Sequence, residues 1–430
     1  MIQSMRARVI ALGLVAVVAG GLIFAVTSGG LFGPAASVGP SGSQAAAGSS
    51  GAPSASGSGL PSEGSGSPSP EVSPSPTPVP TPVMAVAPLD GLLTTPARAK
   101  LHPIAVMIDD LSPARLQSGF SAASVVWQAP AEGGIPRYMM IFQENIPGDV
   151  GPVRSARSYY IDWAAEWRAA YVHAGGSPQA LATLRAQGKG QLVYDANQFY
   201  NGAYFRRITT KAPPHNLYTT GAQLRQLATR VKATSAPGAP HWKFAPDAPL
   251  ELRPVGGTIE TDYQQNHIVY KYDQASNTYK RYVTGFAKQQ VDPSTKKAIA
   301  PKNVVIMLMK FGPLNDGSNH GRLEATVTGK GTAWIATNGH TIKGTWRKKS
   351  LTAPTLFYDA SGHAVTLTAG QTFVQVMKTT DFVKIKDGKM PPAPSPSPSP
   401  SPSAAAGMTG LEPARSPWAD LRRPFFGAIV

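Results

Sequence analysis

Two low-complexity segments limit where this chain can fold. Residues 33–83 and 391–406 consist almost entirely of Pro, Ser, Gly and Ala, and Glu63 and Glu71 are their only charged residues. Such segments bury too little apolar surface to offset the entropy lost on ordering, so we expect them to be disordered spacers. The folding part is therefore limited to about 300 residues, roughly Met84–Met390, which is enough for two domains of ordinary size.

An uncharged apolar run, Val9–Val26, precedes the first spacer. Its 18 residues are just long enough to cross a bilayer as a helix. Arg6 and Arg8 before it favour a cytoplasmic N-terminus. The run therefore predicts a single-pass anchor in the cell membrane, with everything after Thr27 outside the cell. A cleaved secretory signal that releases the protein is the alternative, although Ala25–Thr27 is a poor small-residue cleavage site.

Composition narrows the classes of partner and chemistry. The formal net charge is +16, and both halves share the excess: residues 84–240 carry 15 Lys or Arg against 9 Asp or Glu, and residues 241–390 carry 20 against 11. Such a field favours an anionic partner, such as a wall polymer or phospholipid headgroup, or serves solubility alone. No nucleic-acid-binding motif is recognisable, and we expect no nucleic-acid partner. The 430 residues contain no cysteine, which excludes disulfides, Cys-ligated metals and a lipid-modified N-terminal cysteine among them.

Apolar runs of strand length alternate with helix-like periodicity after the spacer. The continuous run Ile104–Ile108 is typical of a strand in a sheet that is covered on both faces. Further strands are expected at 124–128, 138–142 and 170–173, and helices at 158–169, 178–186 and 220–231. Ser177 and Pro178 suit the start of the second helix, and Gly188 suits its end. The alternation predicts an α/β domain over residues 88–240.

Helical periodicity stops at an expected junction, Thr234–Pro249. Short β-type runs follow, and Asn338-Gly339 and Ser361-Gly362 stand between pairs of them, where hairpin turns need positive φ. These runs predict a mostly-β second domain. The complete division is an anchor or signal segment, a disordered linker, an α/β domain, a β-rich domain and a disordered tail, at residues 1–30, 31–87, 88–240, 241–390 and 391–430.

Five separated blocks follow one another in the first folded part: PIAVMIDDLSPARLQSGF (103–120), AEGGIPRYMMIFQ (131–143), GPVRSARSYY (151–160), YVHAGGSPQAL (171–181) and APPHNLYTT (212–220). Together they resemble the YerB-like family, bacterial envelope proteins that carry a domain of unknown function. The resemblance continues through 287–307 and 338–350, and so covers about residues 98–380. It implies two folded parts and an extracytoplasmic location, but no settled activity. Many members look like lipoproteins; this chain lacks the cysteine, and a transmembrane anchor would do the same tethering.

Polar residues gather around 131–181, and one group surrounds an expected strand end. His173 ends a strand, and Gly175, Gly176 and Ser177 lead into the next helix. Ligands of open α/β sheets bind at that end of the strands, and the free N–H groups of a helix N-terminus favour an anion. Without a ligand, the glycines would simply make a tight turn.

A second group combines basic and acidic side chains. Arg154 and Arg157 flank Ser155 just before a helix, and Glu132 precedes two glycines with Arg137 close behind. Guanidinium groups so close together can grip a phosphate or carboxylate, or pair with the protein's own acids. Glu132 is placed as a general base or hydrogen-bond acceptor, or it simply holds Arg137.

The remaining candidates are Asp109, at the end of the first strand, and His215 and Asn216, in a loop after two prolines. Asp109, Glu132, His173 and His215 have the chemistry for a metal site or an acid–base pair. None shows a metal-ligand spacing such as His-x-x-x-His, and no serine lies in Gly-x-Ser-x-Gly. We therefore expect no metal and no cofactor, and residue types alone leave open whether the protein is an enzyme.

A basic run surrounds a tryptophan in the β-rich part. Lys343, Arg347, Lys348 and Lys349 flank Trp346. Basic groups beside an aromatic ring suit a glycan or an anionic polymer. The alternative is a solvated edge strand whose lysines prevent sheets from associating.

Two functions follow from these patterns. The first is a membrane-anchored extracytoplasmic protein that binds an anionic or glycan ligand of the cell envelope without catalysis, with a wall polymer or an envelope protein as its partner. The second is an envelope hydrolase acting on wall glycan or peptide, with Glu132 or Asp109 as acid or base and His173 or His215 assisting. Both functions require these side chains to converge on one cleft. If they do not, the protein is a tethered scaffold without such a site.

Overall fold

The computed structural model describes residues 83–145, 147–285 and 287–392. The predicted membrane segment Val9–Val26, nearly all of the linker and almost the whole tail lie outside these residues. None of the helices within the described ranges is long and apolar enough to cross a bilayer.

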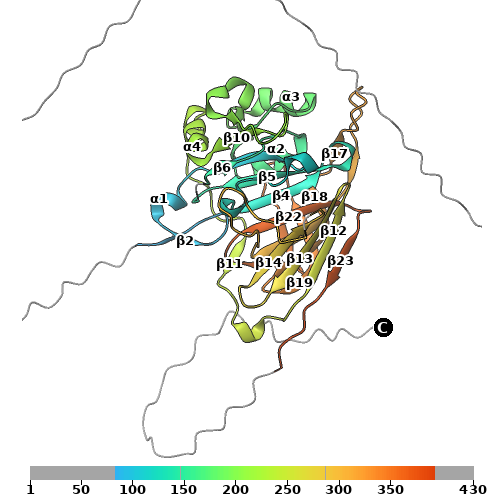
Figure 1. Cartoon of the computed structure of the whole chain (residues 1–430). Helices are drawn as coiled ribbons and strands as arrows, with labels where there is room; N and C mark the ends of the chain where they lie inside the picture. The colour runs from blue at the N-terminus through green and yellow to red at the C-terminus, as the bar shows by residue number, and fades with distance from the viewer. Residues whose placement is uncertain (1–82, 146, 286, 393–430) are drawn as a thin grey trace, which may run out of the picture. The chain divides into compact units, whose positions relative to one another are not determined.

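One ten-stranded sheet forms the centre of the fold (Figure 1). Its strands run in the order β20-β19-β18-β15-β22-β4-β5-β3-β7-β8. Their bounds are β3 (Ile104–Asp109), β4 (Val125–Pro130), β5 (Pro136–Phe142), β7 (Ala170–His173), β8 (Tyr194–Asn197), β15 (Asn303–Met309), β18 (Gly329–Thr337), β19 (His340–Lys348), β20 (Leu356–Tyr358) and β22 (Thr372–Lys378).

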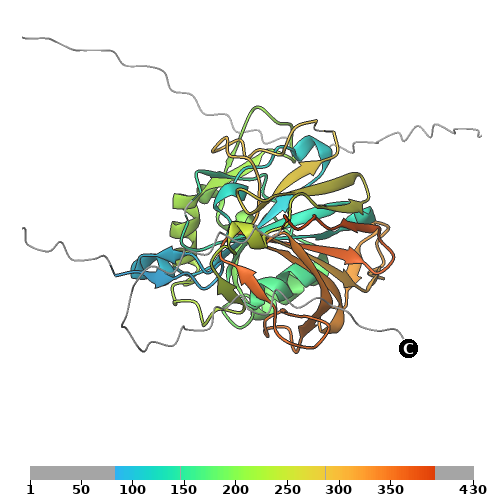
Figure 2. The same cartoon turned by 90° about the horizontal axis from the view of Figure 1, so that it is seen from below.

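The sheet is continuous across the expected boundary between residues 240 and 241. Strand β22 of the second part pairs in parallel with β4 of the first, with Thr372 opposite Val125 and Gln375 opposite Gln128. Figure 2 shows strands of the two parts side by side. The two parts differ in content as the sequence indicates, because the α-helices lie in the first part and the described residues from 241 onward contain none. They share one mostly-β body.

The helices are α1 (Pro96–Ala99), α2 (Ser158–Ala165), α3 (Pro178–Gln187) and α4 (Gly221–Arg230). Short 3-10 turns lie at Ser112–Ala114, Phe120–Ala122, Glu132–Gly134, Gln198–Tyr200, Gly202–Tyr204 and Leu250–Leu252. The smaller sheets contain β1 (Ala85–Val86), β2 (Leu93–Thr94), β6 (Asp149–Val150), β9 (Arg206–Arg207), β10 (Leu217–Thr220), β11 (Lys243–Ala245), β16 (Phe311–Pro313), β17 (Leu323–Ala325) and β21 (Thr366–Thr368). A separate sheet of order β14-β13-β12-β23 contains β12 (Thr258–Tyr263), β13 (Asn266–Asp273), β14 (Thr278–Val283) and β23 (Val383–Lys386).

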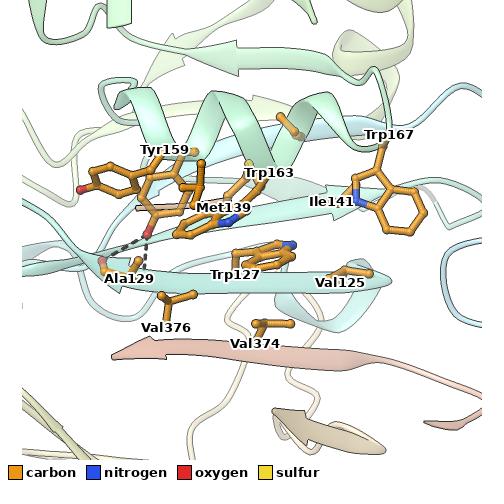
Figure 3. Packing of buried hydrophobic residues seen from close by; sticks show 14 of the residues in the cluster. Val125, Trp127, Ala129, Met139, Ile141, Tyr159, Trp163, Trp167, Val374 and Val376 are labelled. Atoms are coloured by element: carbon orange, nitrogen blue, oxygen red, sulfur yellow. Dashed lines mark hydrogen bonds between the residues drawn. The ribbon is translucent and has the colours of Figure 1, made fainter. Parts of the chain in front are cut away.

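Helix α2 covers one face of the large sheet (Figure 3). The ring of Trp163 stacks on Trp127 of β4 with centroids 4.8 Å apart and planes 11° apart. The Tyr160 hydroxyl accepts a hydrogen bond of 2.8 Å from the Ala129 N–H and lies 3.2 Å from the Ala129 carbonyl oxygen. Such burial of aromatic rings against an apolar strand is a large part of what holds a helix to a sheet.

The opposite face of the sheet is also covered, as the apolar run of β3 predicts. Val106 and Val126 project into a second core, where Ile268 of the four-stranded sheet and Leu227 of α4 also lie. Every residue of β3 and β4 is buried. A sheet with no solvated face can be apolar along the whole strand, which explains why these strands show no alternation.

The basic run around Trp346 is divided between the surface and the interior, because Lys343, Arg347 and Lys349 are exposed whereas Trp346 and Lys348 are not. Trp346 is buried, and its indole N–H donates to the Leu308 carbonyl oxygen at 2.8 Å. Lys348 is fully buried, and its Nζ lies 2.8 Å from Oε1 of Glu166 just past α2. Strand β19 is not an edge strand, because β18 and β20 flank it. The buried ion pair cannot be read from the sequence because its two residues lie far apart in the chain.

Candidate functional site

Most of the polar blocks found in the sequence meet at one edge of the large sheet. Strands β3, β7 and β8 are parallel, so their last residues, including Asp109 and His173, share that edge. Strand β5 runs the opposite way and places its second residue, Arg137, directly opposite Asp109. Strand β4, antiparallel to β5, ends there just before Glu132. The convergence follows from strand direction alone.

A pocket of about 370 Å³ opens at this edge. Its lining combines three arginines and a histidine with two carboxylates and a short apolar stretch: Arg137, Arg154, Arg322, His320, Asp109, Glu132, Leu111, Ile135 and Pro136. The volume lies within the range of small-molecule sites, about 300–1,000 Å³.

Asp109 is the first of two carboxylates that organise the pocket. Its Oδ2 lies 2.7 Å from Nδ1 of His215 and 3.1 Å from Nε of Arg154, and its Oδ1 accepts the Leu111 N–H at 3.1 Å. Burial lowers the pKa of Arg154, and the Asp109 carboxylate opposes this shift. The Arg154 side chain is still 26% exposed. Its guanidinium is therefore anchored on one side and accessible on the other.

Glu132 is the second organising carboxylate. It lies 3.0 Å from Nη2 of Arg137 and also contacts the guanidinium of Arg157. Arg137 donates to the Ser155 carbonyl oxygen at 2.8 Å, so the serine contributes its backbone. Burial lowers the pKa of Arg157 to about 10. A partly desolvated guanidinium binds an anion more strongly than an exposed one, because solvent screens it less.

The β16–β17 hairpin brings the last two polar side chains of the pocket, His320 and Arg322, from the second part of the chain. The hairpin is held against the first part where the Gly133 N–H donates to the Gly321 carbonyl oxygen at 3.1 Å. Arg322 Nη1 lies 2.5 Å from Asp316 Oδ2. No feature of the sequence around His320 and Arg322 points to this pocket, because only tertiary packing carries the hairpin there.

His173 and the turn after it do not line this pocket. The imidazole is fully buried between Oδ1 of Asp195, 2.8 Å from Nε2, and the Gly175 carbonyl oxygen, 2.7 Å from Nδ1. Ser177 caps α3 by accepting the Ala180 N–H.

The two glycines of this turn have structural roles. Gly175 has a φ of +66°, and a side chain there would collide with Phe199. Gly176 lies against Ala156 in an isolated bridge. The turn joins β7 to α3.

Asn216 has a similar role in its own loop. It accepts from Arg207 Nη1 at 2.6 Å and donates to the Ile208 carbonyl oxygen at 3.1 Å. Of the sequence candidates, the pocket therefore takes Asp109, Glu132, Arg137 and Arg154 as lining, with Arg157 and His215 behind them. Within the ranges that the structure describes, no three His, Asp or Glu side chains are grouped as they would be around a metal ion.

The protein is mostly β, and its sequence matches two successive domain models of one family. Residues 89–234 match the N-terminal domain, and residues 259–374 the C-terminal domain, of a family described as "Protein of unknown function (DUF3048)". The chain is a member of the YerB-like family.

It is 28% identical over 316 residues to a Bacillus subtilis (strain 168) protein named "Putative lipoprotein YerB", covering 70% of this chain and 89% of that protein. The crystal structure of Bacillus subtilis YerB superposes with a TM-score of 0.62 at 26% identity, covering 70% of this chain and all of that chain.

Proposed function

We propose that this protein is held outside the cell membrane and binds an anionic ligand of the cell envelope in the pocket at the sheet edge, without catalysing a reaction. The observation that carries the proposal is the charge of the lining. Three guanidinium groups face two carboxylates there, and a fourth guanidinium, that of Arg157, lies behind Glu132. Guanidinium groups are the side chains best suited to bind carboxylate or phosphate through paired hydrogen bonds.

The internal ion pairs support binding because they fix the arginines in place. Asp109 orients Arg154, Glu132 orients Arg137, and Asp316 orients Arg322. Each guanidinium has five N–H donors, so one carboxylate contact leaves others for a ligand. Preorganised donors lower the entropic cost of binding.

The proposed location rests on three features. The apolar run Val9–Val26 is long enough for a membrane anchor, and a Pro- and Ser-rich spacer separates it from the fold. The relative from Bacillus subtilis carries the word lipoprotein in its name. Because this chain has no cysteine to acylate, the apolar run takes the role of a lipid anchor here.

One contact favours the hydrolase as a second candidate. The carboxylate of Asp109 contacts the imidazole of His215, an arrangement that orients a histidine as a general base in several hydrolases. The other acid and the other histidine considered for this role have different partners, because Glu132 contacts two arginines and His173 is buried beside Asp195. A hydrolase would therefore depend on Asp109 and His215.

Sedimentation with purified cell walls tests the binding proposal. The double variant Arg154→Ala/Arg322→Ala should lose most of the wall-bound fraction at about 0.1 M salt. The control Lys330→Ala/Lys343→Ala removes the same charge from exposed positions outside the pocket lining, and it should bind as the unaltered protein does. Equal binding by both variants would refute the pocket. Release of soluble wall fragments that stops in His215→Ala would replace binding by hydrolysis.

A further inference from the structure

A second basic pocket, of about 450 Å³, lies beside the loop of residues 206–216. Its lining includes three basic side chains and four hydroxyl groups: Arg206, Arg207, Lys211, Ser118, Thr209, Thr210 and Tyr218. Asp149 is the single carboxylate in the lining. Arginine, lysine and hydroxyl groups together are the usual donors to phosphate oxygens.

The three cations of the second pocket are held by different partners. Arg206 forms an exposed ion pair of 2.7 Å with Asp149, a contact that solvent weakens. Arg207 donates to the side-chain oxygen of Asn216. Lys211 donates to two backbone carbonyl oxygens, at 2.6 and 2.8 Å, and burial lowers its pKa to about 8. Within the part of the chain that the structure describes, only Arg206 of these three cations pairs with a carboxylate, so the pocket carries excess positive charge.

The two pockets are connected through two short segments. Residues 111–118 supply Leu111 to the first pocket and Ser118 to the second. The 206–216 loop supplies Lys211 to the second pocket and places His215 against Asp109 of the first. The Asp109 carboxylate also acts electrostatically on the Lys211 ammonium. The two pockets therefore share the 111–118 and 206–216 segments.

We propose that the two pockets are subsites for separate anionic groups of one linear, phosphate-bearing polymer. The proposal rests on the function proposed for the first pocket and extends it from a single anion to a chain. A polymer that occupies both subsites pays the entropy of association only once, so its affinity should exceed that of a single phosphate by about 100-fold or more. Because hydroxyl and basic groups surround the second pocket, we expect it to bind the tetrahedral phosphate groups of a polymer more tightly than planar carboxylate groups.

Calorimetric titration of the full chain in detergent tests the proposal. The probes are inorganic polyphosphate, orthophosphate and polygalacturonate, which carries carboxylates in place of phosphates. Arg206→Ala/Arg207→Ala should weaken polyphosphate binding at least tenfold and leave orthophosphate binding at the first pocket unchanged. Arg206→Glu, at an exposed side chain, gives the same test if loss of Arg207 disturbs the loop. Arg154→Ala/Arg322→Ala should weaken the binding of both phosphate probes. The control Lys330→Ala/Lys343→Ala should weaken the binding of neither.

The outcomes separate the two proposals. If second-pocket variants bind polyphosphate as well as the unaltered protein, while Arg154→Ala/Arg322→Ala weakens it, the two-subsite proposal fails and the first pocket stands. If only second-pocket variants weaken binding, the proposed function of the first pocket fails as well. Polygalacturonate binding as tight as that of polyphosphate would overturn the phosphate assignment, as would absence of polyphosphate binding.

Discussion

Replacing Lys348 with methionine tests whether the two parts of the chain form one body. The Lys348 ammonium and the Glu166 carboxylate are both fully buried and lie 2.8 Å apart, joining β19 to the end of α2. Glu166 also accepts from the Thr355 N–H at 3.0 Å and from its hydroxyl at 2.6 Å. Removing one partner of such a pair leaves an uncompensated buried charge, which costs about 3–5 kcal/mol. For a fold of this size, that loss lowers the melting temperature by roughly 10 °C.

The loss should also depend on pH in a defined direction. Burial raises the pKa of Glu166, and the Lys348 ammonium opposes that shift. Without the ammonium, the folded-state pKa rises further, so folding favours the protonated acid. The stability of the variant then falls as the pH rises above the pKa of glutamate in the unfolded chain, about 4.3, towards the raised pKa of Glu166 in the folded protein. The difference in melting temperature between Lys348→Met and the unaltered protein should therefore be smaller at pH 5 than at pH 7.

Thermal unfolding followed by circular dichroism at both pH values measures these effects. The control is Lys349→Met, because Lys349 is the exposed neighbour of Lys348. The double variant Glu166→Leu/Lys348→Met should recover much of the loss, because an apolar pair replaces a buried ion pair at little cost. If Lys348→Met melts within 1 °C of Lys349→Met, taking about 1 °C as the error of melting curves of this kind, the argument is refuted.

Three further variants probe the sheet edge. Glu132→Gln should raise the affinity for orthophosphate about three- to tenfold, because it removes a negative charge beside two guanidinium groups while the amide oxygen can still accept their hydrogen bonds. The exposed change Glu324→Gln should leave the calorimetric affinity unchanged. His173→Asn should cost about 1–3 kcal/mol of unfolding free energy, since the buried imidazole loses its hydrogen bonds to Asp195 and the Gly175 carbonyl oxygen. The orthophosphate Kd should stay unchanged, and a higher Kd would show that His173 belongs to the site. Ser177→Ala should lower stability by about 1 kcal/mol in denaturant unfolding by removing the cap of α3, and no change would show that the cap is not needed.

Local features were predictable from the sequence because short-range chemistry determines them. Strand β7 and the start of α3 follow from an apolar run, two glycines and the Ser177-Pro178 cap. Asn338 and Gly339 have φ of 50° and 77°, as the turn between β18 and β19 requires.

Contacts between distant segments could not be predicted in the same way. Nothing near β22 indicates that it pairs with β4, although this pairing joins the two parts into one sheet. Arg322 reaches the pocket only because its hairpin packs on Gly133. His173 had the residue type and strand-end position of a ligand-binding histidine, but Asp195, on the neighbouring strand, holds it inside the fold. Long-range packing decides such cases.

Diffraction from crystals soaked in tungstate, a heavy analogue of phosphate, tests the central claim most directly. The anion should give an anomalous peak in the pocket at the sheet edge, within about 3 Å of guanidinium nitrogens of Arg154 and Arg322. Crystals of Arg154→Ala/Arg322→Ala should lack this peak. A well-ordered pocket that holds no tungstate in the unaltered protein would contradict the account.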